Sequence, residues 1–355
     1  MNAQTNAQTN AQTNAAGPVA SPAAGTDAAL SVQGLEVSLV GGDRPVPVVT
    51  GANLTVARGE IVGLVGESGS GKSLTSLAIT GLLDPRVARV TSGSVTLFGR
   101  ELLELPEPAM RAVRGKEIGM IFQDPMTSLD PAFTTGYQLT SVLRRHTDLG
   151  RRPARRHALE LLGLVGIADP RRRIDQYPHQ LSGGMRQRVM IAMAIACEPK
   201  ALIADEPTTA LDATTQAQIL ELIKTLAATM HMSTIITTHD LGVVAEVCDR
   251  VAVMYAGQVV EWASTEQLFH RPRHPYTERL LRSLPRVGAA QHLAGIPGQP
   301  PRAGNFPPGC RFAGRCDYAT VPGCTAAVPV LRPLEDDRAA RCVRTAELEL
   351  TGVGA

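Results

Sequence analysis

Short apolar runs rich in valine, isoleucine and leucine alternate with turn residues through most of the chain. Runs of this kind, bounded by glycine, proline or aspartate, are typical of β-strands. We predict strands at residues 31–39, 51–56, 61–65, 94–98, 118–122, 201–204 and 234–238. Several of these runs are continuously apolar, which is typical of strands in a buried parallel sheet.

Two other segments have different patterns. The stretch from about residue 131 to 168 is predicted to be helical, and residues 251–261 predict a hairpin with its turn at Ala256 and Gly257. This order of elements predicts an α/β fold. A sheet-rich core with an antiparallel β subdomain would enclose an inserted α-helical subdomain at about residues 124–190.

The first residues repeat the tetrapeptide Asn-Ala-Gln-Thr without a basic residue or an apolar core. A polar tract with no apolar surface to bury is expected to stay disordered. We therefore assign residues 1–30 to a low-complexity tail that is neither a signal peptide nor an anchor. The rest divides into a main domain at 31–270 and a small, irregular carboxyl extension at 271–355.

The composition is typical of a soluble protein with a substantial core. Of 355 residues, 44% are hydrophobic and 19% are charged, and the formal net charge of +2 gives no reason to expect nucleic-acid binding. An arginine-rich stretch at 144–173 is better explained as a solvated helical face than as a phosphate-binding patch. The longest uninterrupted apolar run, at 189–197, is too short to span a bilayer.

A glycine-rich loop follows the strand predicted at 61–65. Its glycines let the backbone wrap a phosphate with several N–H groups pointing inward, and a helix beginning near Lys72 would aim its positive end at the same anion. Lys72 would reach the β- and γ-phosphates, and Ser73 would bind Mg²⁺. The residues expected to hold the nucleotide are Gly66, Glu67, Ser68, Gly69, Ser70, Gly71, Lys72 and Ser73.

Acidic and polar residues end three further predicted strands. Asp205 and Glu206 end one of them, and strand alternation points their side chains to opposite faces. Asp205 is therefore expected to hold Mg²⁺ through water, and Glu206 to polarise the water that attacks the γ-phosphate. Gln123 ends a second strand, where its amide can contact Mg²⁺ or water, and His239 ends a third.

A second candidate anion site begins at Ser182. Ser182, Gly183 and Gly184 lead into the apolar helix predicted at 189–197, so the helix is N-capped and presents free N–H groups at its start. This site cannot bind the anion that Lys72 already holds. An ordinary helix cap is the alternative reading, and it would hold if the phosphate loop and the acidic pair were absent.

Taken in order, the phosphate loop, Gln123, the Ser182 segment, the acidic pair and His239 resemble the ATP-binding-cassette family over roughly residues 31–345. The resemblance implies a RecA-like P-loop core that binds and hydrolyses ATP, with His239 as the switch histidine. It also implies that the helix start at Ser182 binds the γ-phosphate of ATP held by a facing subunit. Each active site would then be shared by two cassettes.

The last third resembles a narrower group, the ATPase subunits of bacterial dipeptide and oligopeptide importers. The sequence His274-Pro275-Tyr276-Thr277, the segment 296–301 and four cysteines carry this resemblance. It implies three kinds of partner: a second cassette subunit, two integral-membrane permease subunits and, indirectly, an extracytoplasmic peptide-binding protein. It also implies a peripheral location at the cytoplasmic face of the cell membrane.

Other functions stay open at this point. A cassette protein acting in translation or DNA repair without a membrane partner is the alternative, although such proteins usually carry two cassettes or a long coiled coil. Related importers carry nickel, glutathione or other small solutes. No part of an ATPase subunit contacts the cargo, so the sequence does not identify it.

The six cysteines divide into two kinds. Cys197 and Cys248 lie in apolar helical patterns and are expected to be core thiols. The other four lie in a Pro- and Gly-rich stretch and lack the paired Cys-x-x-Cys knuckles of most structural zinc sites. Their spacing alone is therefore compatible with an iron–sulfur cluster, with zinc or with no metal. The subfamily resemblance implies a structural [4Fe–4S] cluster, whose loss would leave the ATP chemistry intact. Its ligands would be Cys310, Cys316, Cys324 and Cys342.

One position departs from the family pattern. Family members usually stack an aromatic ring on adenine from the strand before the phosphate loop, but this chain has no aromatic residue before Phe98. Leu39 lies at about the expected position. An aliphatic side chain can cover a purine by apolar contact without the stacking term, so we expect weaker ATP binding and looser base selectivity.

Overall fold

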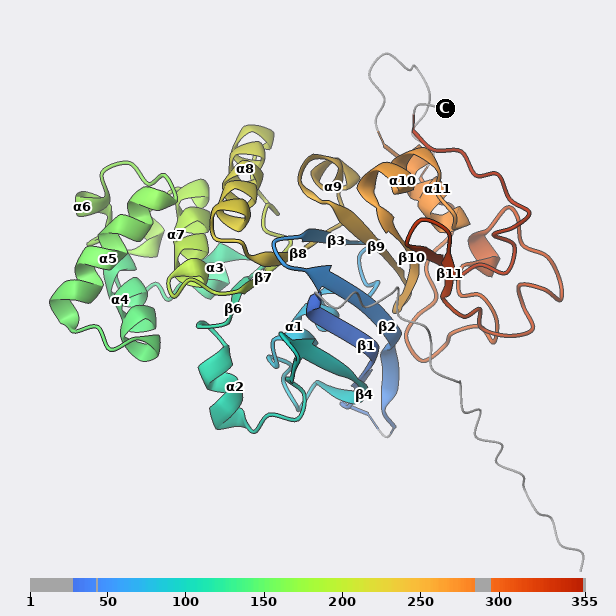
Figure 1. Cartoon of the computed structure of the whole chain (residues 1–355), viewed down its shortest axis with the longest axis horizontal. Helices are drawn as coiled ribbons and strands as arrows, with labels where there is room; N and C mark the ends of the chain where they lie inside the picture. Colours follow the sequence, from blue (N-terminus) through green and yellow to red (C-terminus); the bar gives the residue numbers. More distant parts are fainter. Residues whose placement is uncertain (1–27, 43, 285–294, 354–355) are drawn as a thin grey trace, which may run out of the picture.

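The computed structural model describes residues 28–42, 44–284 and 295–353. Most of the tail predicted at 1–30 therefore lies outside the described residues, although the first strand already begins at Ala28. The helices α4 to α7 form one end of the molecule, two sheets form its centre, and the carboxyl extension forms the opposite end (Figure 1). The site is built at the centre.

The amino-terminal sheet has four antiparallel strands in the order β2-β1-β4-β5. The strands predicted in this region are confirmed, but β1, β2 and β4 begin earlier than predicted because pairing with the neighbouring strand continues toward their amino-terminal ends. The strands are β1 (Ala28–Leu39), β2 (Val46–Ala57), β4 (Ala88–Leu97) and β5 (Arg100–Glu101). This sheet is the predicted antiparallel β subdomain.

The second sheet has eight strands in the order β11-β12-β10-β9-β3-β8-β7-β6, and β9, β3, β8, β7 and β6 run parallel. Every residue of β3 and β7 is buried, as their continuous apolar runs predict. The strands are β3 (Ile61–Val65), β6 (Ile118–Ile121), β7 (Ala201–Asp205), β8 (Ser233–Thr238), β9 (Arg250–Tyr255), β10 (Gln258–Ser264), β11 (Arg332–Leu334) and β12 (Arg338–Ala340).

Eleven α-helices connect these strands within the described residues. Their bounds are α1 (Lys72–Ile79), α2 (Glu107–Val113), α3 (Pro125–Ser128), α4 (Thr135–His146), α5 (Arg151–Leu164), α6 (Pro170–Arg173), α7 (Gly183–Ile195), α8 (Ala213–Thr229), α9 (Leu241–Val247), α10 (Thr265–His270) and α11 (Pro275–Arg282). The helical insertion predicted at 124–190 corresponds to α3 through α7. No helix in the described part of the chain is both long and apolar enough to cross a membrane.

The hairpin predicted around residue 256 joins β9 to β10. Its two turn residues both have positive φ, 45° at Ala256 and 84° at Gly257, which is the backbone of a type I′ turn. A Cβ on Gly257 would lie 1.7 Å from the carbonyl oxygen of Val48. The turn is therefore pressed against the start of β2.

The carboxyl extension is less irregular than the sequence predicts. Its strands β11 and β12 continue the central sheet beyond β10, with Trp262 paired to Ala339. Glu261 of β10 is fully buried, and Arg338 of β12 donates to its Oε1 at 3.3 Å. Two three-residue strands carry too little periodicity to be recognised from sequence, because their stability comes from pairing with β10.

Candidate functional site

The phosphate loop connects β3 to α1, as predicted. Gly71 caps α1 with a left-handed backbone (φ 105°), and Gly69 is also left-handed. A Cβ on Gly66 would lie 2.0 Å from the carbonyl oxygen of Met254, so only glycine fits there. The loop thus passes close over β9 and turns its backbone toward the carboxyl edge of the parallel strands.

Lys72 is buried and points back into the loop. Its Nζ donates to the carbonyl oxygens of Gly66 at 2.8 Å and Glu67 at 3.2 Å. Burial lowers the pKa of Lys72, while the carboxylates of Glu206 and Asp205 act in the opposite direction. The hydroxyl of Ser70 is buried with no hydrogen-bond partner among the described residues. An ammonium, an unsatisfied hydroxyl and a helix start in one loop are a donor set suited to a phosphate chain.

Two of the three residues predicted to bind Mg²⁺, Ser73 and Asp205, lie side by side, whereas Gln123 contacts Glu206. Ser73 at the start of α1 donates to Asp205 Oδ1 at 3.1 Å, and Thr237 of β8 donates to the same oxygen. Hard oxygen ligands of this kind suit Mg²⁺ held through water. Thr237 was not predicted. The feature that could have identified Thr237 is its position in β8, where it pairs with Asp205 in the parallel register.

Glu206 is the centre of a second hydrogen-bond group. Gln123 Nε2 and Thr209 Oγ1 each donate to Glu206 Oε2 at 3.0 Å. His239 Nδ1 lies 3.4 Å from Glu206 Oε1, and Lys72 Nζ lies 3.9 Å from the same oxygen. Glu206 also has a left-handed backbone, with φ 44°, a strained conformation of the kind that clusters at functional sites. The structure thus brings together all three residues predicted to be catalytic.

Ser182 caps α7 as predicted, with its hydroxyl accepting from the backbone N–H of Met185 at 3.3 Å. Ser182 and Gly183 are exposed, and no hydrogen bond within the described residues joins this segment to the phosphate loop. A Cβ on Gly184 would lie 2.8 Å from a methyl group of Thr215. The start of α7 therefore faces solvent, separate from the chain's own phosphate loop.

Leu39 ends β1 and is half-buried against the core of the amino-terminal sheet. A residue of β2, Val49, does lie beside the phosphate loop: its methyl carbon would lie 3.2 Å from a Cβ on Gly71. Val49 was not predicted to approach the loop. The adenine contact of Leu39 stays a prediction.

The two cysteines expected in the core lie just after the ends of helices, Cys248 buried after α9 and Cys197 half-buried after α7. Burial raises the pKa of Cys248 to about 12, which keeps this thiol protonated. Cys197 lies half-buried at the end of α7. Both are confirmed as packed thiols.

The four remaining cysteines line one small cavity of about 20 Å³ and form no disulfide. Backbone N–H groups of Thr320 and Arg344 lie 3.5 and 3.4 Å from the sulfurs of Cys324 and Cys342, as donors do around metal-bound thiolates. However, no group of three or more His, Cys, Asp or Glu side chains in the described ranges is arranged to hold a metal ion. The donor chemistry therefore fits a metal centre, but the closed cavity has room for about one water molecule only. The expected cluster is not supported by this arrangement.

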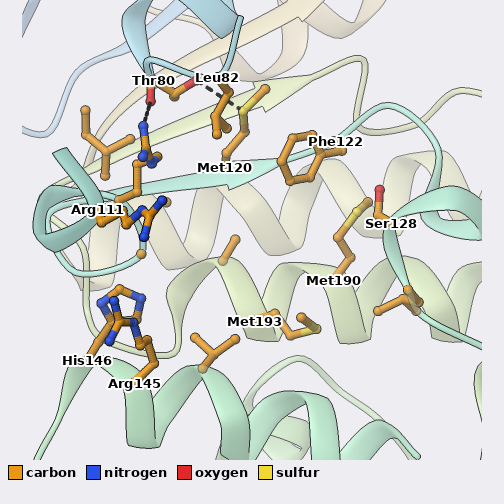
Figure 2. Close-up of a pocket in the computed structure, with 17 residues that line it drawn as sticks. Thr80, Leu82, Arg111, Met120, Phe122, Ser128, Arg145, His146, Met190 and Met193 are labelled. Atoms are coloured by element: carbon orange, nitrogen blue, oxygen red, sulfur yellow. Dashed lines mark hydrogen bonds between the residues drawn. The ribbon is translucent and has the colours of Figure 1, made fainter. Parts of the chain in front are cut away.

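An apolar pocket of about 390 Å³ lies between the central sheet and the helical insertion (Figure 2). Met120 and Phe122 line it from the β6 side, and Met190 and Met193 line it from α7. His146 closes one end, where burial lowers its pKa and the nearby Arg145 and Lys116 lower it further. Phe122 directly precedes Gln123, so the pocket borders the site.

Two sequence profiles of known families match the chain. One, described as ABC transporter, matches residues 49–209. The other, described as the carboxyl-terminal region of oligopeptide/dipeptide transporters, matches residues 260–324. The second profile covers the segment that carries three of the four cysteines.

Curated relatives are similar over nearly their whole length. A putative peptide import ATP-binding protein of Brucella abortus is 49% identical over 331 residues, which cover 90% of this chain and 98% of that protein. Dipeptide transport ATP-binding proteins named DppD are 51% identical in Bacillus subtilis and 49% in Escherichia coli. They cover 83% and 89% of this chain, and 88% and 96% of their own lengths. A cassette solved as a dimer with ADP and Pi is 28% identical with a TM-score of 0.60, over 66% of this chain and 98% of that one.

Proposed function

This chain belongs to the ATP-binding-cassette transporter family and hydrolyses ATP, and from that premise we propose that it powers the import of dipeptides or oligopeptides. The match of residues 260–324 to the carboxyl-terminal region of peptide transporters supports this function over a cassette acting in translation or DNA repair. The names of the relatives support peptides over nickel or glutathione as the cargo.

We propose Glu206 as the general base of hydrolysis, because it is the carboxylate on which the other candidate residues converge. The 3.0 Å contact from Gln123 orients one oxygen, while His239 lies beside the other. A carboxylate held in this way can accept a proton from water attacking the γ-phosphate in line. Lys72 would neutralise charge on the β- and γ-phosphates.

Mg²⁺ would be held by Ser73 and Asp205, with Gln123 as a third candidate ligand. The 3.1 Å contact between Ser73 and Asp205 places two hard oxygens at the base of α1. Mg²⁺ supplies charge neutralisation between the phosphates. The chain's contribution is to hold these oxygens on a buried strand and a helix start, which fixes their separation.

We propose that the Ser182 segment acts on a nucleotide held by a second cassette subunit. Its exposure at the start of α7 supports this, since it makes no hydrogen bond with the chain's own phosphate loop within the described residues. Each catalytic site would need both subunits to meet the charge of the transition state. The isolated chain should then hydrolyse ATP far more slowly than the assembled transporter, and equal specific activities would contradict the shared site.

We propose that two integral-membrane permeases are the membrane partners, and that the pocket of Figure 2 receives a permease helix. Exposed apolar side chains gather around its rim and on the neighbouring α3–α4 segment. They are Leu82, Phe122, Met126, Phe133 and Tyr137. A surface of this kind favours a partner helix. The chain would then lie at the cytoplasmic face of the membrane, and an extracytoplasmic binding protein would deliver peptide to the permeases.

We also propose a [4Fe–4S] cluster in the carboxyl extension. The proposal follows from the subfamily resemblance and from four free thiols that line one cavity, with backbone N–H groups directed at two of their sulfurs, although the described side chains are not arranged to hold a metal ion. Burial, with a smaller contribution from neighbouring cysteines, raises the pKa of Cys310, Cys316 and Cys342, so loss of these protons needs a compensating cation.

Transport in proteoliposomes tests the main proposal. We would assemble the chain with its second cassette and permeases, supply the binding protein with labelled dipeptide, and add Mg-ATP on the cassette side. Uptake that requires ATP and exceeds that of labelled Ni²⁺ or glutathione would support the proposal. ATP turnover with no uptake of any di- or oligopeptide would contradict peptide import while leaving the ATPase assignment intact.

A further inference from the structure

The carboxyl extension touches the phosphate loop through an ion pair that spans 248 residues of sequence. Arg315 Nη1 donates to Glu67 Oε2 at 2.8 Å, and Nη2 donates to Oε1 at 3.0 Å. The Arg315 side chain is only 8% exposed, so this is a two-pronged contact of a shielded guanidinium. Such pairs give geometric specificity as well as energy.

Tyr276 of α11 contacts the backbone of Glu67. The N–H of Glu67 donates to the Tyr276 hydroxyl at 2.9 Å. Tyr276 is fully buried against the rings of Tyr255 and Phe312, with centroids 4.5 and 5.4 Å away. Burial raises the pKa of Tyr276, so the phenol stays neutral and its oxygen remains an acceptor. Glu67 is therefore fixed at both its side chain and its amide.

Arg315 is itself held by the extension. It donates to the carbonyl oxygens of Ile296 at 3.1 Å and Pro297 at 2.9 Å, and to the Tyr255 hydroxyl at 3.2 Å. It also lies in a single 3₁₀ turn, Ala313–Arg315, directly before Cys316. The position of the Arg315 guanidinium thus depends on how the segment around Cys310 and Cys316 is folded.

A second route leads from the extension to the same loop. Arg311 donates to the carbonyl oxygen of Ala256 in the β9–β10 turn. In that turn, Gly257 N–H donates to the carbonyl oxygen of Ser70 at 2.8 Å. The extension therefore braces the loop directly at Glu67 and, through the turn, at Ser70.

We propose that Tyr276 and Arg315 are positioning residues for ATP binding, which act through Glu67 to hold the phosphate loop in its phosphate-wrapping shape. The inference rests on the ATP binding that the family shows and does not depend on the cargo or on the cluster. It gives the carboxyl extension a role at the nucleotide site.

Electrostatics explain why such a device is useful here. Glu67 adds a carboxylate to a loop that must bind the polyanionic phosphates of ATP. Repulsion between this carboxylate and the phosphates would weaken ATP binding. Arg315 neutralises that carboxylate and turns it away. Glu67 also presents its carbonyl oxygen to Lys72 Nζ at 3.2 Å. A shift of Glu67 would therefore move a contact of the lysine that binds phosphate.

The test measures ATP affinity and turnover in the assembled transporter for Tyr276→Phe and Arg315→Gln. We expect Kd and KM for ATP to rise about tenfold for Arg315→Gln and about threefold for Tyr276→Phe, with kcat within about twofold. The matched control is Arg279→Gln, which removes an ion pair with Asp317 in the same region without touching the loop. It should keep the wild-type affinity.

A double variant separates positioning from general loss of structure. In Glu67→Gln/Arg315→Gln the residue through which Arg315 acts is already altered, so ATP affinity should be no weaker than in Arg315→Gln alone. Unchanged ATP affinity in both single variants would overturn the proposal. A double variant clearly weaker than Arg315→Gln would also overturn it, because the two residues would then act independently. An equal loss in Arg279→Gln would overturn it as well, because the effect would then be a loss of folding.

Discussion

Replacing Glu206 by glutamine removes one charge from the site and almost no volume. The amide oxygen can still accept from Gln123 and Thr209, each now 3.0 Å from Glu206 Oε2. The amide nitrogen would then take the place of Oε1, which faces His239 at 3.4 Å and Lys72 at 3.9 Å. The substitution therefore keeps the local geometry and removes the anionic proton acceptor.

The expected loss of hydrolysis in Glu206→Gln follows from the role of Glu206 as the general base. Positioned general bases contribute about 10²- to 10⁴-fold to a rate, so single-turnover hydrolysis should fall by at least ~100-fold. ATP binding should stay within about threefold, because Lys72 and the loop N–H groups are unchanged and one negative charge beside the γ-phosphate is lost. ATP-bound cassette pairs should accumulate, since closure no longer leads to cleavage.

The assay is single-turnover hydrolysis of labelled ATP in the assembled transporter, with nucleotide binding measured on the same preparation. Glu221→Gln, an exposed substitution of the same kind on α8, is the matched control and should hydrolyse at the wild-type rate. A Glu206→Gln variant within threefold of the wild type would refute the role of this carboxylate. The base would then have to be sought elsewhere in the site.

Three further variants test other residues. Lys72→Ala should weaken ATP binding at least ~10-fold and stop transport, as measured by nucleotide titration and peptide uptake, while Lys224→Ala on α8 should do neither. Leu39→Phe should tighten ATP binding about two- to fivefold if Leu39 covers adenine; no change would move the adenine contact to another residue, such as Val49. Cys324→Ser should lower iron and sulfide from about four each per chain toward zero in anaerobically purified protein; stoichiometric zinc, or colourless wild-type protein, would contradict the cluster.

Local sequence patterns predicted the elements that carry the nucleotide site. The loop after β3, the acidic pair after β7 and His239 after β8 each follow a buried apolar run, and parallel strands bring their carboxyl ends to one edge. For that reason the meeting of Gln123, Glu206 and His239 could be anticipated. Their separate roles remain predictions that the variants above test.

Contacts between distant segments could not be predicted in this way. Tyr276 lies in the motif at residues 274–277 that carries the subfamily resemblance, yet nothing local indicates that its hydroxyl accepts a hydrogen bond from the N–H of Glu67. Arg315 lies in a turn with no strong periodicity, and its partner is 248 residues away. The expectation that the extension is independent of the ATP chemistry therefore has a structural argument against it.

The pairing of β12 with β10 also bears on how this protein unfolds. If the chain ended at α11, β10 would become an unpaired edge strand at Trp262, and Glu261 would lose its contact with Arg338. An unpaired strand margin is a template for aggregation, and a buried carboxylate without its cation is destabilising. The cassette and the extension should therefore melt in one cooperative transition, so the two family segments recognised in the sequence behave as a single thermodynamic domain.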